Sequence, residues 1–284
     1  MWIYLSLISA FLLGIYDVAK KAAVGKNSVM WVLFISCLIS ALMMAPMYES
    51  GSAKDFLQIV PKCLLVSASW ISGLWGMKLL PLTTSSTIKA SRPVFVVLLS
   101  ILLFGESLTW LQWTGVLVSL SALWMLSRSS RKEGINFASD KGVWAMWISV
   151  ATGVASALYD KHIMKGLSPN FVQSWGTLGI AAVMGLALLV EILIAKSKGE
   201  KQQKFRWDWN LLLVSVSILL ADMAYFHALK EPDALLSVVS LLRRGCAIVS
   251  FAISVVLFKE KNYKSKAIDL SILMAGMAIL ALAS

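Results

Sequence analysis

The chain has 284 residues, of which 58% are hydrophobic and only 14% charged. A soluble domain carries about a quarter charged residues, so this composition disfavours a soluble protein. The apolar residues fall in long blocks, which is typical of membrane spans. The net charge of +11 does not indicate a nucleic-acid partner, because most basic residues lie in short segments beside these blocks.

Ten apolar segments, each near the ~20 residues that cross a bilayer, predict ten transmembrane helices. Their approximate ranges are 2–20, 28–47, 57–80, 83–104, 107–127, 142–163, 170–195, 210–230, 233–258 and 263–283. Tight turns are expected at Leu80-Pro81, Gly105-Glu106 and Glu231-Pro232-Asp233. The first segment has no basic stretch before it, so we expect a retained span and not a cleaved signal peptide.

The two halves of the chain resemble each other. "LLGIYDVAKKA" in the first span matches "VASALYDKHIMKG" in the sixth, and "VVLLSILLFGE" matches "VSFAISVVLFKE" at the ends of the fourth and ninth. Five spans per half is an odd number, so the second copy must enter the membrane in the opposite orientation. The predicted fold is an all-α integral membrane protein in which about ten transmembrane helices form two inverted five-helix repeats around a central cavity. Residues 1–127 and 142–284 would be the repeats, joined by a basic cytoplasmic linker at 128–141.

Four basic residues fall inside predicted spans, near the middle of the bilayer. Lys89 and Arg92 lie in the fourth span, and Arg243 and Arg244 in the ninth. An arginine at this depth costs at least ~2.5 kcal/mol if it faces lipid, so these side chains should face water, counter-ions or a ligand.

Serines at helical spacing extend both basic stretches. Ser85, Lys89 and Arg92 share one helix face, and so do Ser240 and Arg244. Such stripes predict an anion-attracting cavity, whereas the structural alternative is neutralisation by Asp17, Asp160 and Asp222 in ion pairs.

Other polar and aromatic residues are weaker candidates for the substrate site. Tyr16 and Tyr159 stand beside Asp17 and Asp160 in the matching motifs, and Trp75 lies in the third span, where packing is the alternative role. Glu106 and Glu260 close matching segments at turns, which favours a structural role at a helix start. We expect no catalytic residue, cofactor or metal site, because His162 and His227 have no second ligand at helical spacing and the cysteines are unpaired.

The span count, the duplication and the "LFGE" and "LFKE" ends together resemble the EamA-like branch of the drug/metabolite transporter superfamily. The resemblance covers almost the whole chain. It implies that spans 1, 3, 4, 6, 8 and 9 border a central cavity while spans 5 and 10 pack outside. The superfamily carries amino acids, nucleotide sugars and drugs among other cargoes, so the resemblance does not name a substrate.

The leading hypothesis is a secondary transporter, an exporter or exchanger of a small anionic or zwitterionic metabolite such as an amino acid, acting by alternating access. A flippase for a lipid-linked head group is the alternative, and an integral membrane enzyme or structural membrane protein is the alternative from another class. No Walker A loop is present, so direct drive by ATP is not expected. The partners would be the substrate and the lipid bilayer, with no nucleic acid, and the oligomeric state is left open, since a monomer would suffice.

The basic residues also predict orientation in a bacterial inner membrane. If both termini are extracytoplasmic, 17 basic residues lie at cytoplasmic edges and 5 at the opposite edges. The first group is Lys20, Lys21, Lys26, Lys78, Arg128, Arg131, Lys132, Lys141, Lys196, Lys198, Lys201, Lys204, Arg206, Lys259, Lys261, Lys264 and Lys266.

A C-terminal fusion tests this orientation. A reporter that is active only in the cytoplasm should stay inactive when it follows residue 284, because the positive-inside rule places that end outside. The same reporter inserted in the linker 128–141 provides the control and should be active. Activity at the C-terminus would mean that the span count or the orientation is wrong.

Overall fold

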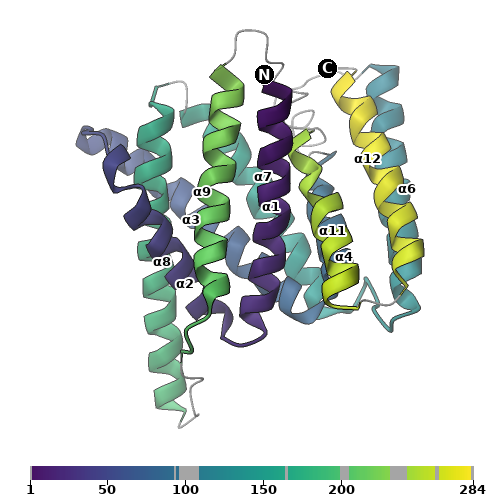
Figure 1. Cartoon of the computed structure of the whole chain (residues 1–284), viewed down its shortest axis with the longest axis horizontal. Coiled ribbons are helices and arrows are strands. Elements are labelled where there is room, and N and C mark those ends of the chain that lie inside the picture. Colours follow the sequence, from purple (N-terminus) through teal and green to yellow (C-terminus); the bar gives the residue numbers. More distant parts are fainter. Residues whose placement is uncertain are drawn as a thin grey trace.

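The computed structural model describes residues 2–92, 94–95, 109–163, 166–198, 205–230, 242–259 and 262–282. These residues form an all-helical bundle (Figure 1). The helices are α1 (Trp2–Val24), α2 (Val29–Met43), α3 (Ala53–Leu79), α4 (Leu82–Ala90), α6 (Trp110–Arg131), α7 (Lys141–Ile163), α8 (Pro169–Ser197), α9 (Trp209–Lys230), α11 (Cys246–Leu257) and α12 (Tyr263–Leu282), with a short 3-10 helix, η1 (Ala45–Met47), after α2.

Polar caps set where several of these helices begin. Ser52 and Asp55 form a reciprocal capping box at the start of α3, and Thr109 and Gln112 form another at the start of α6. Ser168 caps α8 by accepting a hydrogen bond from the backbone of Phe171. The turn predicted at Leu80-Pro81 is confirmed between α3 and α4. The turns predicted at Gly105-Glu106 and at 231–233, and both Glu106 and Glu260, lie outside the described residues.

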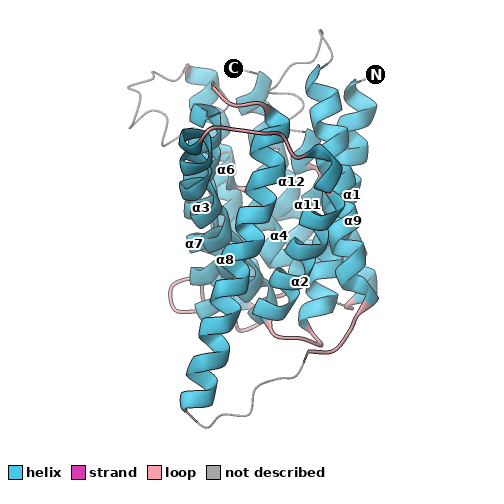
Figure 2. Ribbon diagram, turned by 90° about the vertical axis from the view of Figure 1, so that its left-hand side faces the viewer, coloured by secondary structure: helices cyan, strands magenta, loops and turns pink. Residues whose placement is uncertain are grey.

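Several of the described helices have the length and the apolar surface of membrane-spanning helices. Four segments, Trp2–Val24, Ala53–Leu79, Lys141–Asp160 and Asn170–Ser197, are long and apolar enough to cross a membrane, judged by length and composition. Large apolar side chains such as Leu186, Leu189 and Leu193 on α8 are exposed, as lipid contact requires. Both termini lie at the same end of the bundle (Figures 1 and 2), as an even number of crossings demands.

Helix packing follows the exchange expected of two inverted repeats. The first helix of each half packs against the third helix of the other half, so that α1 contacts α9 and α3 contacts α7. The second helices α2 and α8 pack against each other, and so do the fifth helices α6 and α12. Swapping the two halves therefore reproduces the pattern of neighbours, and the predicted fold class is confirmed. We propose that the boundary between the repeats lies in the segment 132–140, between α6 and α7.

One predicted interface lysine has a different environment. Lys266 is fully buried, and its amino group donates to Glu133 at 2.6 Å and to the hydroxyl of Thr83 at 3.1 Å. The charge is tolerated there because a carboxylate neutralises it and a hydroxyl accepts a second bond. Lys266 thus ties α12 to the segment after α6 and to α4.

Close contact between α6 and α12 depends on glycine, and this generates a stability prediction. A Cβ at Gly276 would lie 2.8 Å from the backbone nitrogen of Ser119 and 2.9 Å from the carbonyl oxygen of Gly115. Gly276→Ala should therefore push the helices apart and destabilise the protein by about 1–3 kcal/mol. The midpoint of thermal unfolding in detergent measures the loss. Ser271→Ala, on the exposed face of α12, is the control and should change little, and equal effects of the two variants would refute the packing argument.

Candidate functional site

A central cavity of about 230 Å³ lies between six spans. Its walls come from α1, α3, α7 and α9, from α4 and the residues after it, and from the start of α11 with the two residues Arg243 and Arg244 shortly before it. These are spans 1, 3, 4, 6, 8 and 9, the set that the family resemblance implies. The lining side chains include Leu13, Tyr16, Asp17, Lys20, Ser69, Trp70, Met77, Lys89, Arg92, Met146, Ser149, Ile218, Tyr225, Arg243, Arg244 and Cys246.

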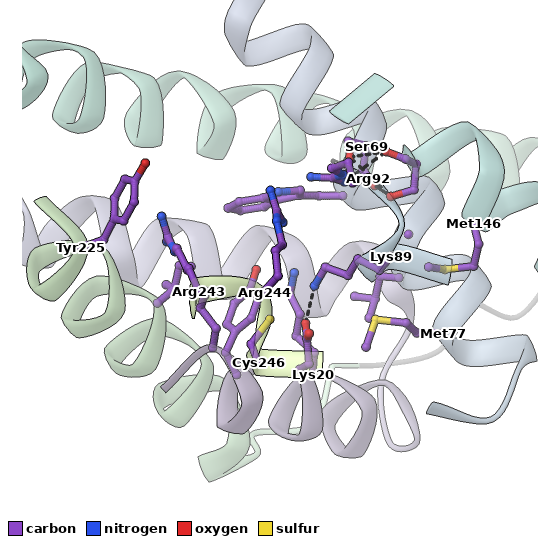
Figure 3. Close-up of a pocket in the computed structure, with 18 residues that line it drawn as sticks. Lys20, Ser69, Met77, Lys89, Arg92, Met146, Tyr225, Arg243, Arg244 and Cys246 are labelled. Atoms are coloured by element: carbon purple, nitrogen blue, oxygen red, sulfur yellow. Dashed lines mark hydrogen bonds and ion pairs between the residues drawn. The ribbon is translucent and has the colours of Figure 1, made fainter. Parts of the chain in front are cut away.

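Basic side chains dominate this cavity (Figure 3). Its lining contains five basic residues and one carboxylate, Asp17. The predicted cations Lys89, Arg92, Arg243 and Arg244 all reach the cavity, and the structure adds Lys20. The first and fourth spans of the first half and the ninth span of the second half thus place their basic side chains around the same cavity.

Two of the five cations are neutralised by carboxylates. The amino group of Lys89 lies 2.6 Å from Asp17, whose side chain is almost fully buried. Arg243 pairs with Asp222 on α9, and its guanidinium also lies over the ring of Tyr225, 4.2 Å from the ring centre. The structural alternative, neutralisation by ion pairs, therefore applies to Lys89 and Arg243. Each ion pair lowers the cost of a buried charge.

Lys20 is held by aromatic rings. Its amino nitrogen lies 4.4 Å from the ring centre of Tyr16 and 4.8 Å from that of Trp70, and the residue is 5% exposed. Cation–π contacts of this kind partly replace the hydration of the ammonium group. The ion pairs among the described residues include no carboxylate partner for Lys20.

Arg92 is hydrogen-bonded to the side of the cavity that α3 and α7 form. Its Nη2 donates to the hydroxyl of Ser69 at 2.9 Å and to the carbonyl of Ser149 at 3.1 Å. These two serines also bond to each other, so they clamp α3 to α7 at this point. The guanidinium lies against Gly153, where a Cβ would overlap it. The Nε of Arg92 is buried without a hydrogen-bond partner among the described residues.

The charge balance leaves the cavity cationic. With Asp17 and Asp222 each neutralising one cation, Lys20, Arg92 and Arg244 remain without a carboxylate among the ion pairs of the described segments. Unpaired buried cations are costly, and a buried N–H without an acceptor adds to that cost. An anion in the cavity would remove the first of these penalties, the cost of the unpaired charges.

Other predicted site residues lie elsewhere. Tyr159 and Asp160, which repeat the Tyr16-Asp17 motif, contact α3 instead of the cavity: the hydroxyl of Tyr159 donates to the carbonyl of Gln58 at 2.9 Å, and Asp160 lies 2.5 Å from Lys62. Ser85 is buried and donates to the carbonyl of Pro81 within its own turn.

Two further predicted site residues, Trp75 and Ser240, are not among the described residues that line the cavity. Trp75 is 47% exposed on the outside of α3, where an indole ring can contact lipid, while Trp70 on the same helix lines the cavity. Ser240 lies outside the described residues.

Sequence reasoning missed Lys20, Ser69 and Ser149. It counted Lys20 among the basic residues at the cytoplasmic edges of the membrane. The spacing of Leu13, Tyr16, Asp17 and Lys20, at i, i+3, i+4 and i+7, already placed all four on one face of α1. Ser69 and Ser149 carry no comparable signal, since single serines are common in membrane helices.

Cysteine labelling tests whether the cavity is wet and cationic. Cys246 lines it, whereas Cys37 and Cys63 are buried and can be replaced by serine. In that background an anionic, sulfonate-bearing thiol reagent should modify Cys246 roughly tenfold faster than a trimethylammonium reagent of similar size, because the local potential is positive. The free thiol N-acetylcysteine in parallel reactions calibrates the two reagents. Equal relative rates would contradict the charge balance, and no modification by either would contradict water access.

Comparison with known proteins places the chain. Residues 1–128 match the EamA-like transporter family. The chain is 21% identical to UDP-uronic acid transporter 1 of Arabidopsis thaliana over 230 residues, which is 77% of this chain and 71% of that protein. A crystal structure with 15% identity superposes with a TM-score of 0.65, covering 99% of this chain and 97% of the other, which shows a shared fold. The first 128 residues are therefore similar to the EamA-like transporter family, and the chain is a multi-pass membrane protein that shares its fold with a solved structure over almost its whole length.

Proposed function

We propose that this transporter carries a small metabolite with an anionic group and binds it in the central cavity. The observation that supports this most directly is the excess of cations: Lys20, Arg92 and Arg244 line the cavity, and the described ion pairs give none of them a carboxylate. A neutral or cationic substrate would leave these charges uncompensated. A carboxylate or phosphate would supply the missing counter-charge.

Arg92 is suited to grip such an anion. Its Nη2 is committed to Ser69 and Ser149, which fixes the guanidinium plane, and its positive charge lines the cavity without a carboxylate among the described ion pairs. A guanidinium can offer two parallel N–H bonds to a carboxylate or phosphate, so a pre-oriented arginine binds at low entropic cost. We assign Arg92 and Arg244 as the principal anion ligands, with Lys20 contributing charge.

The cavity size favours a small cargo. Its volume of about 230 Å³ is below the roughly 300–1,000 Å³ of pockets that hold drug-sized ligands. The plant relative is named for the transport of UDP-uronic acid, which is also an anion but a much larger one. We therefore infer a shared preference for negative charge and a smaller substrate for this chain.

The mechanism we propose is alternating access between two helix groups. Arg92 is bonded to the α3–α7 group through Ser69 and Ser149. Lys20 lies on α1, which packs with α9, and Arg244 lies shortly before α11, which packs with α1. A bound anion attracts both groups, and without it their like charges repel. Movement of the loaded carrier is thus favoured over that of the empty one, which favours exchange. Residence in a bacterial inner membrane with both termini outside belongs to the same proposal.

Arginine substitution tests the site. Arg92→Ala and Arg244→Ala should each leave a folded, membrane-inserted protein and weaken substrate binding about 10- to 100-fold, the range for a lost charged hydrogen bond. Arg92→Lys should restore only part of the affinity, because the charge returns without the fork. Binding or uptake is compared at matched expression.

A matched arginine outside the cavity provides the control. Arg128 lies over the ring of Trp124 on α6, and Arg128→Ala should bind substrate normally. Wild-type activity in both cavity variants would refute the assignment. Failure of both to fold would favour a purely structural role.

A further inference from the structure

A second, smaller cavity adjoins the basic one. It measures about 40 Å³ and lies between α1, α2, α3, α8 and α9. Tyr16, Trp70 and Ile218 line both cavities, so the two cavities meet at these three side chains. The remaining lining side chains are Ser36, Cys37, Ser40, Met44, Gln173, Thr177, Ile180, Val214, Leu219 and Asp222.

The serine and threonine hydroxyl groups of this second cavity have already donated their protons. Ser36 donates to the carbonyl of Leu33 at 3.1 Å, Ser40 to that of Ser36 at 2.9 Å, and Thr177 to that of Gln173 at 2.7 Å. A hydroxyl has one proton and two lone pairs, so each oxygen keeps the capacity to accept. These three side chains therefore offer acceptors to a ligand, whereas the amide of Gln173 and the phenol of Tyr16 can each donate or accept.

The Asp222–Arg243 ion pair spans the boundary between the two cavities. Arg243 lines the basic cavity and Asp222 lines the second one. The Oδ1 of Asp222 accepts from Arg243, and the described contacts give its other oxygen no partner. The pair thus presents its positive end to the basic cavity and its negative end to the second cavity. The basic cavity therefore presents mainly hydrogen-bond donors, whereas the second cavity presents mainly acceptors.

We propose that the second cavity is a specificity subsite for a hydrogen-bond donor at the end of the substrate remote from its anionic group. The occupant would be an ammonium group in preference to a hydroxyl, because Asp222 adds negative charge to the neutral acceptors. This inference rests on the proposed function, which places the anionic group beside Arg92 and Arg244. The substrate would then be a short-chain molecule with an anionic group at one end and a hydrogen-bond donor at the other. ω-Amino acids fit this description best, and ω-hydroxy acids come second.

The dimensions support a terminal group in the second cavity. A water molecule occupies about 30 Å³ of liquid, so about 40 Å³ admits an ammonium or hydroxymethyl group and no ring. The side chains of Tyr16 and Trp70 stand between the charged ends, and methylene groups pack well against aromatic rings. An α-amino acid carries both charges on one carbon and cannot place them in separate cavities.

A matched ligand series tests the subsite. Purified protein is titrated with unsubstituted, ω-hydroxy and ω-amino carboxylic acids of three to six carbons, and with the α-amino isomers. At the best chain length the ω-amino acid should bind about tenfold or more tightly than the unsubstituted acid, with the ω-hydroxy acid between them. The α-amino isomer should gain nothing over the unsubstituted acid.

Variants locate the effect. Thr177→Val removes one acceptor while keeping the side-chain shape, and Asp222→Asn removes the negative charge. Each should reduce the ratio of ω-amino to unsubstituted affinity by several-fold without abolishing binding of the unsubstituted acid. Thr152→Val is the matched control, since Thr152 makes the same hydroxyl bond to its own helix but lines neither cavity, and its ratio should equal that of wild type.

The outcomes separate the two proposals. If the unsubstituted acids bind and the ω-amino group adds nothing, or if Thr177→Val leaves the ratio unchanged, the subsite is refuted and the basic cavity stands. If none of the acids binds at any chain length, the proposed function is refuted together with the subsite. Tighter binding of the α-amino isomer would also refute the subsite, because both charges would then lie in one cavity.

Discussion

Burial of charge in the hydrocarbon region constrains this protein more than any other interaction. A basic side chain there must find a carboxylate, an aromatic ring, a hydroxyl or a ligand, because lipid offers no hydrogen bonds. Lys89 and Arg243 have carboxylates, and Lys20 has two aromatic rings. Arg92 bonds to two serines, and its buried Nε has no acceptor within the described part of the chain. The remaining excess of positive charge is what makes the cavity a site for anions and distinguishes it from a packed polar core.

The inverted repeat brings these charges together but does not make the halves chemically equal. Exchange packing of α1 with α9 and of α3 with α7 creates a central space between two related groups. In the first half, Tyr16 and Asp17 face that space, whereas Tyr159 and Asp160 in the second half bind Gln58 and Lys62 on α3. One copy of the motif therefore shapes the cavity while the other stabilises a helix interface. Such divergence gives an asymmetric site within a symmetric scaffold.

Sequence patterns predicted the architecture well because span length and apolar content are set by the bilayer itself. Except for the fourth and ninth spans, which the structure describes only in part, the helices begin and end close to the predicted ranges. Lys89, Arg92, Arg243 and Arg244 line the cavity as the cost of lipid exposure requires. Helical spacing shows which residues share a face but not where that face points. Asp160 was grouped with the site through its match to Asp17, and Trp75 as an aromatic residue of the third span, although their helices direct them elsewhere. Lys20 was missed because one of the two rings that contact its amino group, that of Trp70, is distant in the sequence.

The most direct test of the central claim is a thermal-shift screen of purified protein against metabolites grouped by charge. Ligands that bind the native state raise the unfolding midpoint by mass action. The excess of cations predicts that the stabilising compounds are small anions and zwitterions with an accessible carboxylate or phosphate. It also predicts that the amides of the carboxylate-bearing compounds, which lack the anionic group, have no effect. Stabilisation by neutral or cationic metabolites, with none by anions, would contradict the account.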